Sequence, residues 1–569
     1  MDKKIAIVYL FSILLIGNAA AQSLPVGTPV LEDAYRNAQL LGQVDSSASF
    51  TARPFFPIHA GKTGYHLNES GYITEGPVEK DAGVASKKRL ITLLPILWKQ
   101  QFNSDHPEGI NDGSMIPSRG YQTLVSGGFY AKYGFLSLQF YPELVYAENR
   151  DFQGFPDKQP DNVWRNYNSF FLNTIDIPEK FGNNPYKKAL WGQSSIRLTF
   201  GAVSFGLSNE NLWWGPGVQN ALLMTNSAAG FKHLTLNTVR PLLTSIGSLE
   251  GQIIAGRLDQ SGFPNLDPQR LLLHKTTYNP KPNDWRYLNG IVISYQPKWV
   301  PGLFMGATRS YIIYSKDLGT GIKDYLPIIT PITKKADGGN SEDAIPRDQL
   351  ASVFMRWVAK ESHQEIYFEY GREDHSYDLR DFLLEPSHIN AYILGFSKLI
   401  VIKKHLHEYI QVNVELTQLE QALSTYLRSN FSSPGSFGWY HHGLVYDGYT
   451  QQGQYLGAGI GSGSNMQSIN LSWVKGFKRI GIQIKRVVQN NDFYNNTIKD
   501  YRSHWVDLGG SLFGIWNYKK FLISAKVEPV SSINYQWLYD PIPSVPPAWW
   551  DKGKNRLNIH GELAMMYQF

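Results

Sequence analysis

Ile410-Gln411-Val412-Asn413-Val414-Glu415-Leu416-Thr417 alternates apolar and polar side chains without a break. Successive side chains of a β-strand point to opposite faces, so this stretch predicts a strand with one apolar and one polar face. The same alternation recurs at residues 136–140 and 196–200. An apolar outer face and a polar inner face are typical of the strands of a transmembrane β-barrel.

The connections between the predicted strands alternate between short and long. Eight short ones centre near Lys132, Gly201, Gly247, Trp299, Glu361, Lys403, Gly476 and Tyr518. Nine long ones cover roughly 103–120, 147–193, 209–234, 259–288, 312–349, 374–388, 418–466, 490–503 and 531–554. Membrane barrels have short periplasmic turns, long outer loops and an even number of strands. With both termini in the periplasm, the fold class is therefore all-β, a closed antiparallel transmembrane β-barrel of about 18 strands.

A soluble β-sandwich is the alternative fold, but nothing in a sandwich requires its connections to alternate in length. The carboxyl-terminal strand favours the membrane barrel. Gly561, Leu563, Met565, Tyr567 and Phe569 occupy every second position up to the last residue. This ending resembles the assembly signal of outer-membrane barrels.

The first residues have the features of a cleaved signal peptide. Lys3 and Lys4 precede a short apolar run at 5–17, and small residues follow at 19–21. We expect residues 1–21 to be the signal peptide, 22–87 a periplasmic N-terminal segment, and 88–569 the barrel with long extracellular loops. After Gln22 no apolar run is long enough for a transmembrane helix.

The N-terminal segment contains one predicted helix. Thr28 can cap it, Pro29 occupies its first turn, and Gly42 can end it.

The composition excludes several classes of site. The 569 residues include no Cys, so disulfides, Cys-ligated metals and cysteine nucleophiles are excluded. The net charge is +6 and no basic run suggests nucleic acid as a partner. The chain is 14% aromatic but only 42% hydrophobic, with a mean hydropathy of −0.29, which suits strands that are apolar on alternate positions.

The long loops are rich in Trp, Tyr, His and Gly. Sugar rings stack their C–H faces on aromatic rings, and their hydroxyl groups need both donors and acceptors. Aromatic residues near strand ends also form the interfacial girdle, which is the competing interpretation. The candidate polysaccharide-binding residues are Trp213, Trp214, Asn226, Arg257, Asp259, Arg372, His375, Tyr440, His441 and Tyr449.

Catalytic interpretations are weaker. The segment His407-Glu408-Tyr409-Ile410-Gln411 nearly matches H-E-x-x-H, but it ends in Gln and lies on a predicted strand. We therefore expect no metal site and no cofactor. The carboxylates of Glu369, Glu373 and Asp374 could form a glycosidase pair, and roles beside Arg372 in structure or sugar binding compete with this interpretation.

Several motifs occur in an order that resembles the Wzi capsule-assembly family. They are Trp213–Gly217, Leu222–Phe231, Gly256-Arg257-Leu258-Asp259 and Gly448-Tyr449-Thr450 followed by Gly453 and Leu456-Gly457. The resemblance implies an eighteen-stranded outer-membrane barrel with helical N-terminal material at its periplasmic end. It also implies a lectin-like role in holding capsular polysaccharide on the cell surface. The long loops at 147–193 and 312–349 do not match the family pattern, so the resemblance does not identify the ligand.

The leading hypothesis is a non-enzymatic barrel in the cell outer membrane that binds capsular or other surface polysaccharide and supports its attachment and assembly. Expected partners are capsular polysaccharide or exopolysaccharide, outer-membrane lipid and lipopolysaccharide, with envelope export or assembly machinery as an open candidate. A porin or selective channel is the first alternative, and a surface glycan-processing enzyme is the second.

Overall fold

The computed structural model describes residues 23–57, 64–68, 70–76, 89–264, 279–329, 346–373, 379–384, 387, 389–403, 407–422, 438–542 and 553–568. The predicted signal peptide and Phe569 lie outside these residues.

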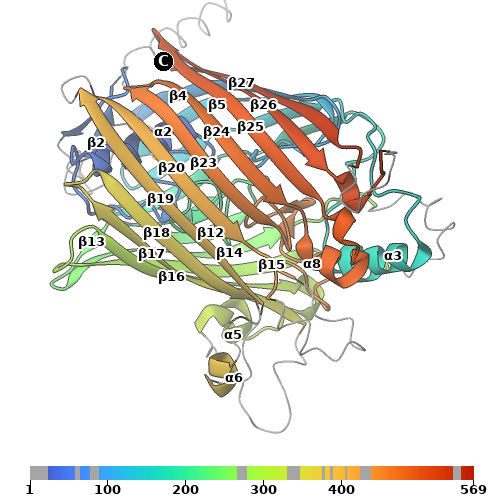
Figure 1. The fold of residues 1–569 in the computed structure, drawn as a ribbon. Helices are drawn as coiled ribbons and strands as arrows, with labels where there is room; N and C mark the ends of the chain where they lie inside the picture. The colour runs from blue at the N-terminus through green and yellow to red at the C-terminus, as the bar shows by residue number, and fades with distance from the viewer. Residues whose placement is uncertain are drawn as a thin grey trace, which may run out of the picture.

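The described strands form one closed antiparallel barrel in which β27 pairs with β4 to close the ring (Figure 1). The barrel strands are β4 (Arg89–Asn103), β5 (Gly120–Tyr133), β6 (Leu136–Phe140), β7 (Glu143–Ala147), β8 (Tyr186–Leu190), β9 (Ser195–Phe200), β10 (Val203–Ser208), β12 (His233–Thr238), β13 (Leu242–Leu243), β14 (Gly247–Leu258), β15 (Arg286–Pro297), β16 (Leu303–Tyr314), β17 (Arg347–Ala359), β18 (Gln364–Glu373), β19 (Asn390–Lys403), β20 (Glu408–Gln418), β23 (Asn465–Lys475), β24 (Lys478–Val488), β25 (Val506–Tyr518), β26 (Phe521–Ile533) and β27 (Arg556–Tyr567).

The barrel has eighteen strands, as predicted. Three of them are interrupted, so that β6 with β7, β8 with β9, and β12 with β13 each make one strand. The eight short turns also lie where they were predicted. Figure 1 shows these turns at one end of the barrel, and the long loops with α3 (Asp161–Asn166) and α8 (Asn491–Phe493) at the other.

Alternation along the strands separates the two faces of the wall. On β20, Gln411, Glu415 and Thr417 are buried toward the lumen, whereas Leu416 is exposed on the outside. On the outer face, Ile484 is 65% exposed and Leu512 is 59% exposed. An outward apolar belt around a polar interior is the surface that a bilayer requires of a barrel.

One predicted boundary was wrong. The long connection expected to reach residue 193 ends at β8, whose residues Tyr186–Leu190 pair with β7. Lys187 and Lys188 interrupt the apolar alternation there because this part of the strand lies at its outer end, where polar side chains on both faces are tolerated.

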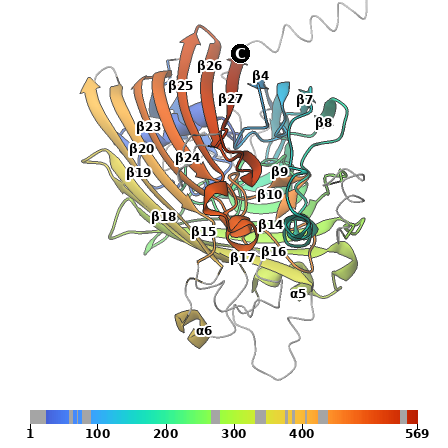
Figure 2. The same cartoon turned by 45° about the vertical axis from the view of Figure 1, so that its right-hand side comes forward.

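We number the loops at the outer end in chain order: loop 1 (104–119), loop 2 (148–185), loop 3 (209–232), loop 4 (259–285), loop 5 (315–346), loop 6 (374–389), loop 7 (419–464), loop 8 (489–505) and loop 9 (534–555). Loops 5 and 6 carry the short helices α5 (Ile322–Tyr325) and α6 (Leu379–Leu384), which project outward below the barrel in Figures 1 and 2.

The predicted N-terminal helix is α2 (Pro29–Leu40). Thr28 is its N-cap residue, but its hydroxyl donates to the Pro25 carbonyl oxygen (2.7 Å) instead of capping the helix. Gly42 has a φ of +68° and follows the last turn, which is the conformation that ends many helices.

The helix α2 lies inside the barrel at the short-turn end. Arg36 Nε is 2.7 Å from Glu365 Oε1, and Asn37 Nδ2 donates to the Tyr409 hydroxyl (3.2 Å). Both wall residues lie within a few residues of the short turns. The described part of the N-terminal segment therefore lies across this end of the lumen, and the hairpin of β2 (Gly64–Leu67) and β3 (Ile73–Gly76) packs beside it.

None of the described helices is long and apolar enough to cross a membrane.

Candidate functional site

Loop 3 runs through the middle of the lumen and is held there by two carboxylates of the wall. Glu415 on β20 accepts hydrogen bonds from the backbone N–H groups of Val218 (2.7 Å), Gln219 (3.1 Å) and Asn220 (2.9 Å). Glu369 on β18 accepts from the Leu222 N–H (3.4 Å). Backbone donors of a buried loop need such partners, so these carboxylates fix the path of loop 3.

The N-terminal segment meets loop 3 inside the barrel. The short strands β1 (Ala52–Arg53) and β11 (Trp213–Trp214) pair in antiparallel register. The Arg53 guanidinium lies 4.4 Å from the centre of a Trp213 ring, and its Nη1 pairs with Glu32 (3.0 Å). A segment from the short-turn end thus joins a loop from the opposite end by backbone pairing.

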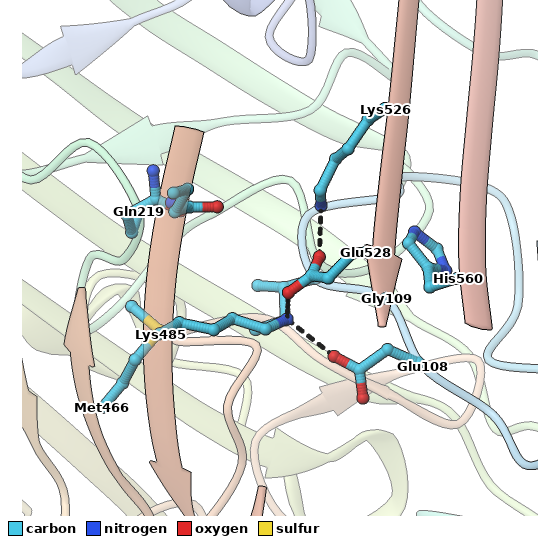
Figure 3. Close-up of a pocket in the computed structure, with 10 residues that line it drawn as sticks. Glu108, Gly109, Gln219, Met466, Lys485, Lys526, Glu528 and His560 are labelled. Atoms are coloured by element: carbon cyan, nitrogen blue, oxygen red, sulfur yellow. Dashed lines mark hydrogen bonds and ion pairs between the residues drawn. The ribbon is translucent and has the colours of Figure 1, made fainter. Parts of the chain in front are cut away.

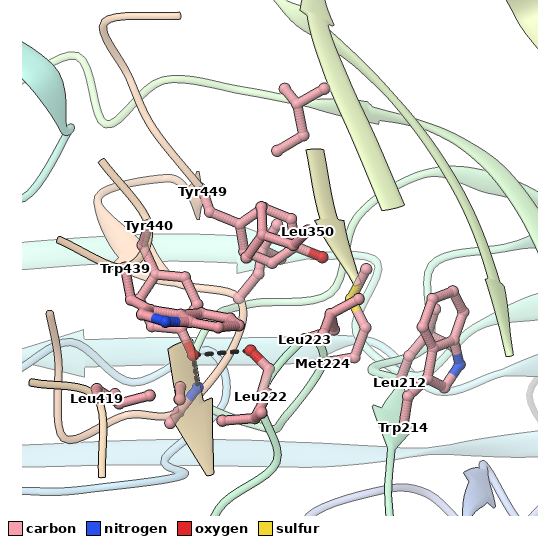
Figure 4. Close-up of a cluster of buried hydrophobic side chains, with 14 of the residues drawn as sticks. Leu212, Trp214, Leu222, Leu223, Met224, Leu350, Leu419, Trp439, Tyr440 and Tyr449 are labelled. Atoms are coloured by element: carbon pink, nitrogen blue, oxygen red, sulfur yellow. Dashed lines mark hydrogen bonds between the residues drawn. The ribbon is translucent and has the colours of Figure 1, made fainter. Parts of the chain in front are cut away.

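Loop 7 packs on loop 3, and Figure 4 shows Trp439, Tyr440 and Tyr449 beside Leu222 and Leu223. The Tyr440 hydroxyl donates to the Leu222 carbonyl oxygen (2.7 Å) and accepts from the Ala458 N–H (2.8 Å). Tyr449 stacks on Tyr440 with ring centres 5.8 Å apart. We call loops 1, 3 and 7 with the N-terminal segment the plug.

Four predicted stacking residues belong to the core of this plug. Trp214, Tyr440 and Tyr449 have no exposed surface, and Trp213 is 4% exposed. The Trp214 Nε1 donates to Gln252 on β14 (2.9 Å), and its ring faces Gly290 on β15 so closely that a Cβ there would collide with it. In this structure these four side chains are buried packing residues, and none of them presents an exposed surface to the outside.

Asn226 and His441 are also inside. Asn226 Nδ2 donates to the Asn111 carbonyl oxygen of loop 1 (2.8 Å), so it ties two plug loops together. His441 Nδ1 lies 2.8 Å from the Thr174 hydroxyl. Burial, together with the nearby charge of Lys281, lowers the pKa of His441 to about 3. The buried ring is thus neutral at ordinary pH.

Arg257 and Asp259 lie at the outer rim, where the structure brings them together with three residues that were not predicted. Arg257 Nε is 2.8 Å from Asp259 Oδ1, and its guanidinium lies 5.2 Å from the centre of a Trp285 ring. The Lys188 ammonium donates to Gln452 Oε1 (2.6 Å), and the Gln452 N–H donates to the Asp259 carbonyl oxygen (2.9 Å). We call Lys188, Arg257, Asp259, Trp285 and Gln452 the rim cluster.

The rim cluster presents an aromatic ring, cations and a carboxylate to the outside. The Arg257 side chain is 53% exposed and that of Asp259 is 42% exposed, while Trp285 is half-buried. Strand register creates this grouping, since Arg257 of β14 pairs with Tyr287 of β15, two residues after Trp285. Sequence reasoning missed Trp285 because its neighbours give no signal of that register.

The remaining predicted residues lie elsewhere. Arg372 is half-buried on β18, in register with Ala351 and Asn390, away from the rim cluster. His375, like Asp374, lies outside the described residues. Of the proposed glycosidase carboxylates, Glu369 holds loop 3, and Glu373 accepts from the Tyr440 N–H (2.7 Å).

Comparisons with known proteins agree with this architecture. A family model described as capsule assembly protein Wzi matches residues 110–507, which is more than half of the 569 residues. No curated protein matches the chain. The solved structure of Escherichia coli Wzi is similar over 96% of this chain and 100% of its own, with a TM-score of 0.57 and 12% identity. That protein is reported as an outer-membrane protein involved in group 1 capsule assembly and as a carbohydrate-binding β-barrel.

Two other solved barrels are less similar. OccAB2 of Acinetobacter baumannii matches with 8% identity and a TM-score of 0.38, over 84% of this chain and 97% of its own. OpdK of Pseudomonas aeruginosa matches with 7% identity and a TM-score of 0.36, over 85% and 98%. The family match covers most of the barrel, and on this ground the chain belongs to the Wzi capsule-assembly family.

Proposed function

We propose that this protein is a non-enzymatic outer-membrane barrel that binds capsular polysaccharide at its outer rim and supports its attachment and assembly at the cell surface. The observation that carries this proposal is the plug, which fills the lumen from both ends with hydrogen-bonded loops and packed aromatic residues. A barrel closed in this way offers its outer surface, rather than a pore, to a polymer. The family membership and the reported carbohydrate binding of E. coli Wzi support the same conclusion.

The rim cluster has the chemistry that a sugar needs. The Trp285 ring provides a face for C–H groups, while Arg257, Asp259 and Lys188 provide donors and acceptors for hydroxyl groups. A single exposed cluster of this size binds weakly. Repeating units of one polymer on many barrels strengthen such binding through multivalency.

Replacing Trp285 by Ala tests this site. We expect Trp285→Ala to weaken retention of the purified barrel on immobilised capsule from its own source by up to about tenfold, since aromatic contacts contribute roughly 0.5–1.5 kcal/mol. The matched control is Trp299→Ala, which removes a Trp that is 70% exposed in the turn between β15 and β16, at the opposite end of the same strands. Equal retention of both variants and the wild-type protein contradicts the site.

The glycan-processing alternative is disfavoured by the positions of Glu369 and Glu373. Both carboxylates are buried, and each accepts a backbone hydrogen bond from the plug. A glycosidase pair must reach both sides of a glycosidic bond. Release of reducing sugar from capsule by the wild-type barrel, and its loss in Glu369→Gln, is the result that would restore this alternative.

A further inference from the structure

A cavity of about 50 Å³ lies inside the lumen, between loop 1 and the wall formed by β24, β26 and β27 (Figure 3). Charged side chains surround it in an unbroken chain of ion pairs. The Lys485 ammonium lies 2.7 Å from Glu108 and 2.9 Å from Glu528, and Lys526 lies 2.8 Å from Glu528. The chain continues from Lys526 to Glu562 (3.1 Å).

Loop 1 contributes only carboxylates to this chain. Glu108 pairs with Lys485, and Asp112 pairs with Lys99 on β4 (2.6 Å). The wall itself contributes three lysines, Lys99, Lys485 and Lys526, which we call the lysine wall, and the two carboxylates of Glu528 and Glu562. Within this chain of ion pairs the wall therefore contributes one more lysine than carboxylates, and the two carboxylates of loop 1 reverse that balance.

The neighbouring wall also has spare hydrogen-bonding capacity. Gln483 lines the cavity, and it is in register with Asn470 on β23 and Ser511 on β25. Ser511 and Ser472 are at least nine-tenths buried. Within the part of the chain that the structure describes, neither their hydroxyl oxygens nor Asn470 Oδ1 has a hydrogen-bond partner. Hydroxyl and amide groups beside a cationic wall suit a ligand that carries both hydroxyl groups and a negative charge.

We propose that the lysine wall is a binding chamber for carboxylate-bearing sugars, and that the Glu108 and Asp112 carboxylates of loop 1 occupy it in the absence of ligand. This inference rests on the proposed polysaccharide function and names the class of sugar. Removing one partner of a buried ion pair is strongly unfavourable, because it leaves an uncompensated charge. A ligand carboxylate that replaces Glu108 keeps Lys485 paired, whereas a neutral sugar does not.

Loop 1 covers the chamber from the outer side of the barrel. It starts at the outer end of β4, where Asp105 pairs with Arg556 (2.6 Å), and descends to Glu108 and Asp112. Neutral contacts also hold it, since Asn111 Nδ2 donates to the Gln219 carbonyl oxygen (2.7 Å). Binding therefore has to exchange the two loop carboxylates for ligand carboxylates while loop 1 moves aside.

The first experiment compares glucuronate with glucose, which differ at C6 in the carboxylate, by titration calorimetry on the detergent-solubilised full chain. In the variant Glu108→Gln/Asp112→Asn, the internal competitors are neutral, so we expect glucuronate to bind at least tenfold more tightly than in the wild-type protein. Glucose affinity stays unchanged. Lys485→Gln should abolish the preference for glucuronate. The control Asp500→Asn removes a carboxylate from an exposed pair with Arg502 in loop 8 and should change nothing.

A second measurement uses the native loop 1 and so stays decisive if the double variant does not fold. The chain has no Cys, so Gln483→Cys introduces a single thiol that lines the chamber. We expect glucuronate, but not glucose, to slow its modification by an anionic methanethiosulfonate at least fivefold. If glucuronate and glucose have equal effects in both experiments, or if neither sugar has an effect, the proposed chamber is rejected.

The experiments separate failure of the proposed chamber from failure of the proposed polysaccharide-binding function at the rim cluster. If Trp285→Ala weakens retention on capsule while glucuronate and glucose behave alike, the proposed function stands and the chamber is rejected. If neither the wild-type barrel nor any variant is retained on capsule, the proposed function fails. If glucuronate still protects the thiol in that case, the chamber stands as a small-anion site.

Discussion

At the scale of single residues, buried polar side chains determine where the loops go. Glu415 is the strongest example, because one carboxylate accepts three consecutive N–H groups of loop 3 and the Tyr367 hydroxyl (2.8 Å). Hydrogen bonds to a charged group contribute about 1.5–3 kcal/mol each, so this residue dominates the local stability of loop 3.

Replacing Glu415 by Gln removes the charge and one acceptor oxygen. We expect the amide protons of residues 218–220 to exchange about 100-fold faster, which corresponds to roughly 3 kcal/mol. Hydrogen exchange read by mass spectrometry measures this. Glu361→Gln, which makes the same chemical change in an exposed short turn, is the control. Unchanged exchange in loop 3 contradicts the anchoring role of Glu415.

His441 makes the packing of loop 7 dependent on pH. Burial lowers its folded-state pKa from 6.5 to about 3, so the unfolded loop binds a proton in acid that the folded loop does not. The stability contribution of His441 is therefore complete above pH 6.5 and declines as the pH falls toward 3. Between pH 7.5 and pH 5 the loss is about 2 kcal/mol.

The matched variant is His441→Asn, whose amide can still bond the Thr174 hydroxyl but does not titrate in this range. We expect hydrogen exchange in loop 7 to speed up on acidification in the wild-type barrel and much less in the variant. Burial raises the pKa of Asp176, which contributes in the opposite direction in both proteins, so the difference between them isolates His441. Identical pH profiles contradict this prediction.

At the scale of elements, the pairing of β1 with β11 connects the two ends of the barrel. It depends on Arg53, which contacts Trp213, pairs with Glu32 and donates to the Gly217 carbonyl oxygen (3.3 Å). This arrangement seats the N-terminal segment against loop 3 rather than against the wall alone.

Breaking this contact should release the N-terminal segment. Arg53→Met leaves Glu32 without its ion-pair partner, and breaking such a buried pair costs about 3–5 kcal/mol. We expect faster proteolysis within residues 23–57, measured by limited digestion of the folded barrel. The double variant Arg53→Met/Glu32→Gln should recover much of the resistance, because no unpaired charge remains. Equal sensitivity of the single and double variants contradicts the electrostatic explanation.

At the scale of the whole molecule, eighteen strands enclose a lumen wide enough for a channel unless it is filled. Loops from one end and the N-terminal segment from the other fill it, and the apolar cluster around Trp214, Leu222 and Trp439 joins them to the wall. The barrel thus resembles a globular protein in its interior and a membrane protein on its outside.

We therefore expect the wild-type barrel to be silent in planar bilayers. Replacing residues 210–231 of loop 3 by a short Gly-Ser linker should produce discrete open steps, because loop 3 occupies the centre of the lumen. The same replacement at residues 535–553 of loop 9 is the control. Steady conductance of the wild-type protein contradicts the plugged architecture and favours the porin alternative.

The strands and their number were predictable from the sequence because a bilayer imposes a local pattern. Each wall residue must be apolar if it faces lipid, so Ile410 to Leu416 reveals its two faces without any knowledge of neighbouring strands. The helix α2 was predictable for a similar reason, since Pro29 and Gly42 mark its ends locally. The surroundings of the candidate binding residues were less predictable: Arg257 and Asp259 lie at the exposed rim, whereas Trp214 and Tyr440 are buried.

The sequence by itself determined the barrel. Contact with lipid requires apolar residues at alternate positions of each strand, and the short and long connections give the even number of strands that a closed barrel needs. Only the tertiary structure decided what the loop aromatic residues do. An aromatic ring in a loop can face water, lipid or the lumen, and distant partners make that choice. Trp214 meets Gln252 and Gly290, and Tyr440 meets Leu222, across separations that no local pattern encodes.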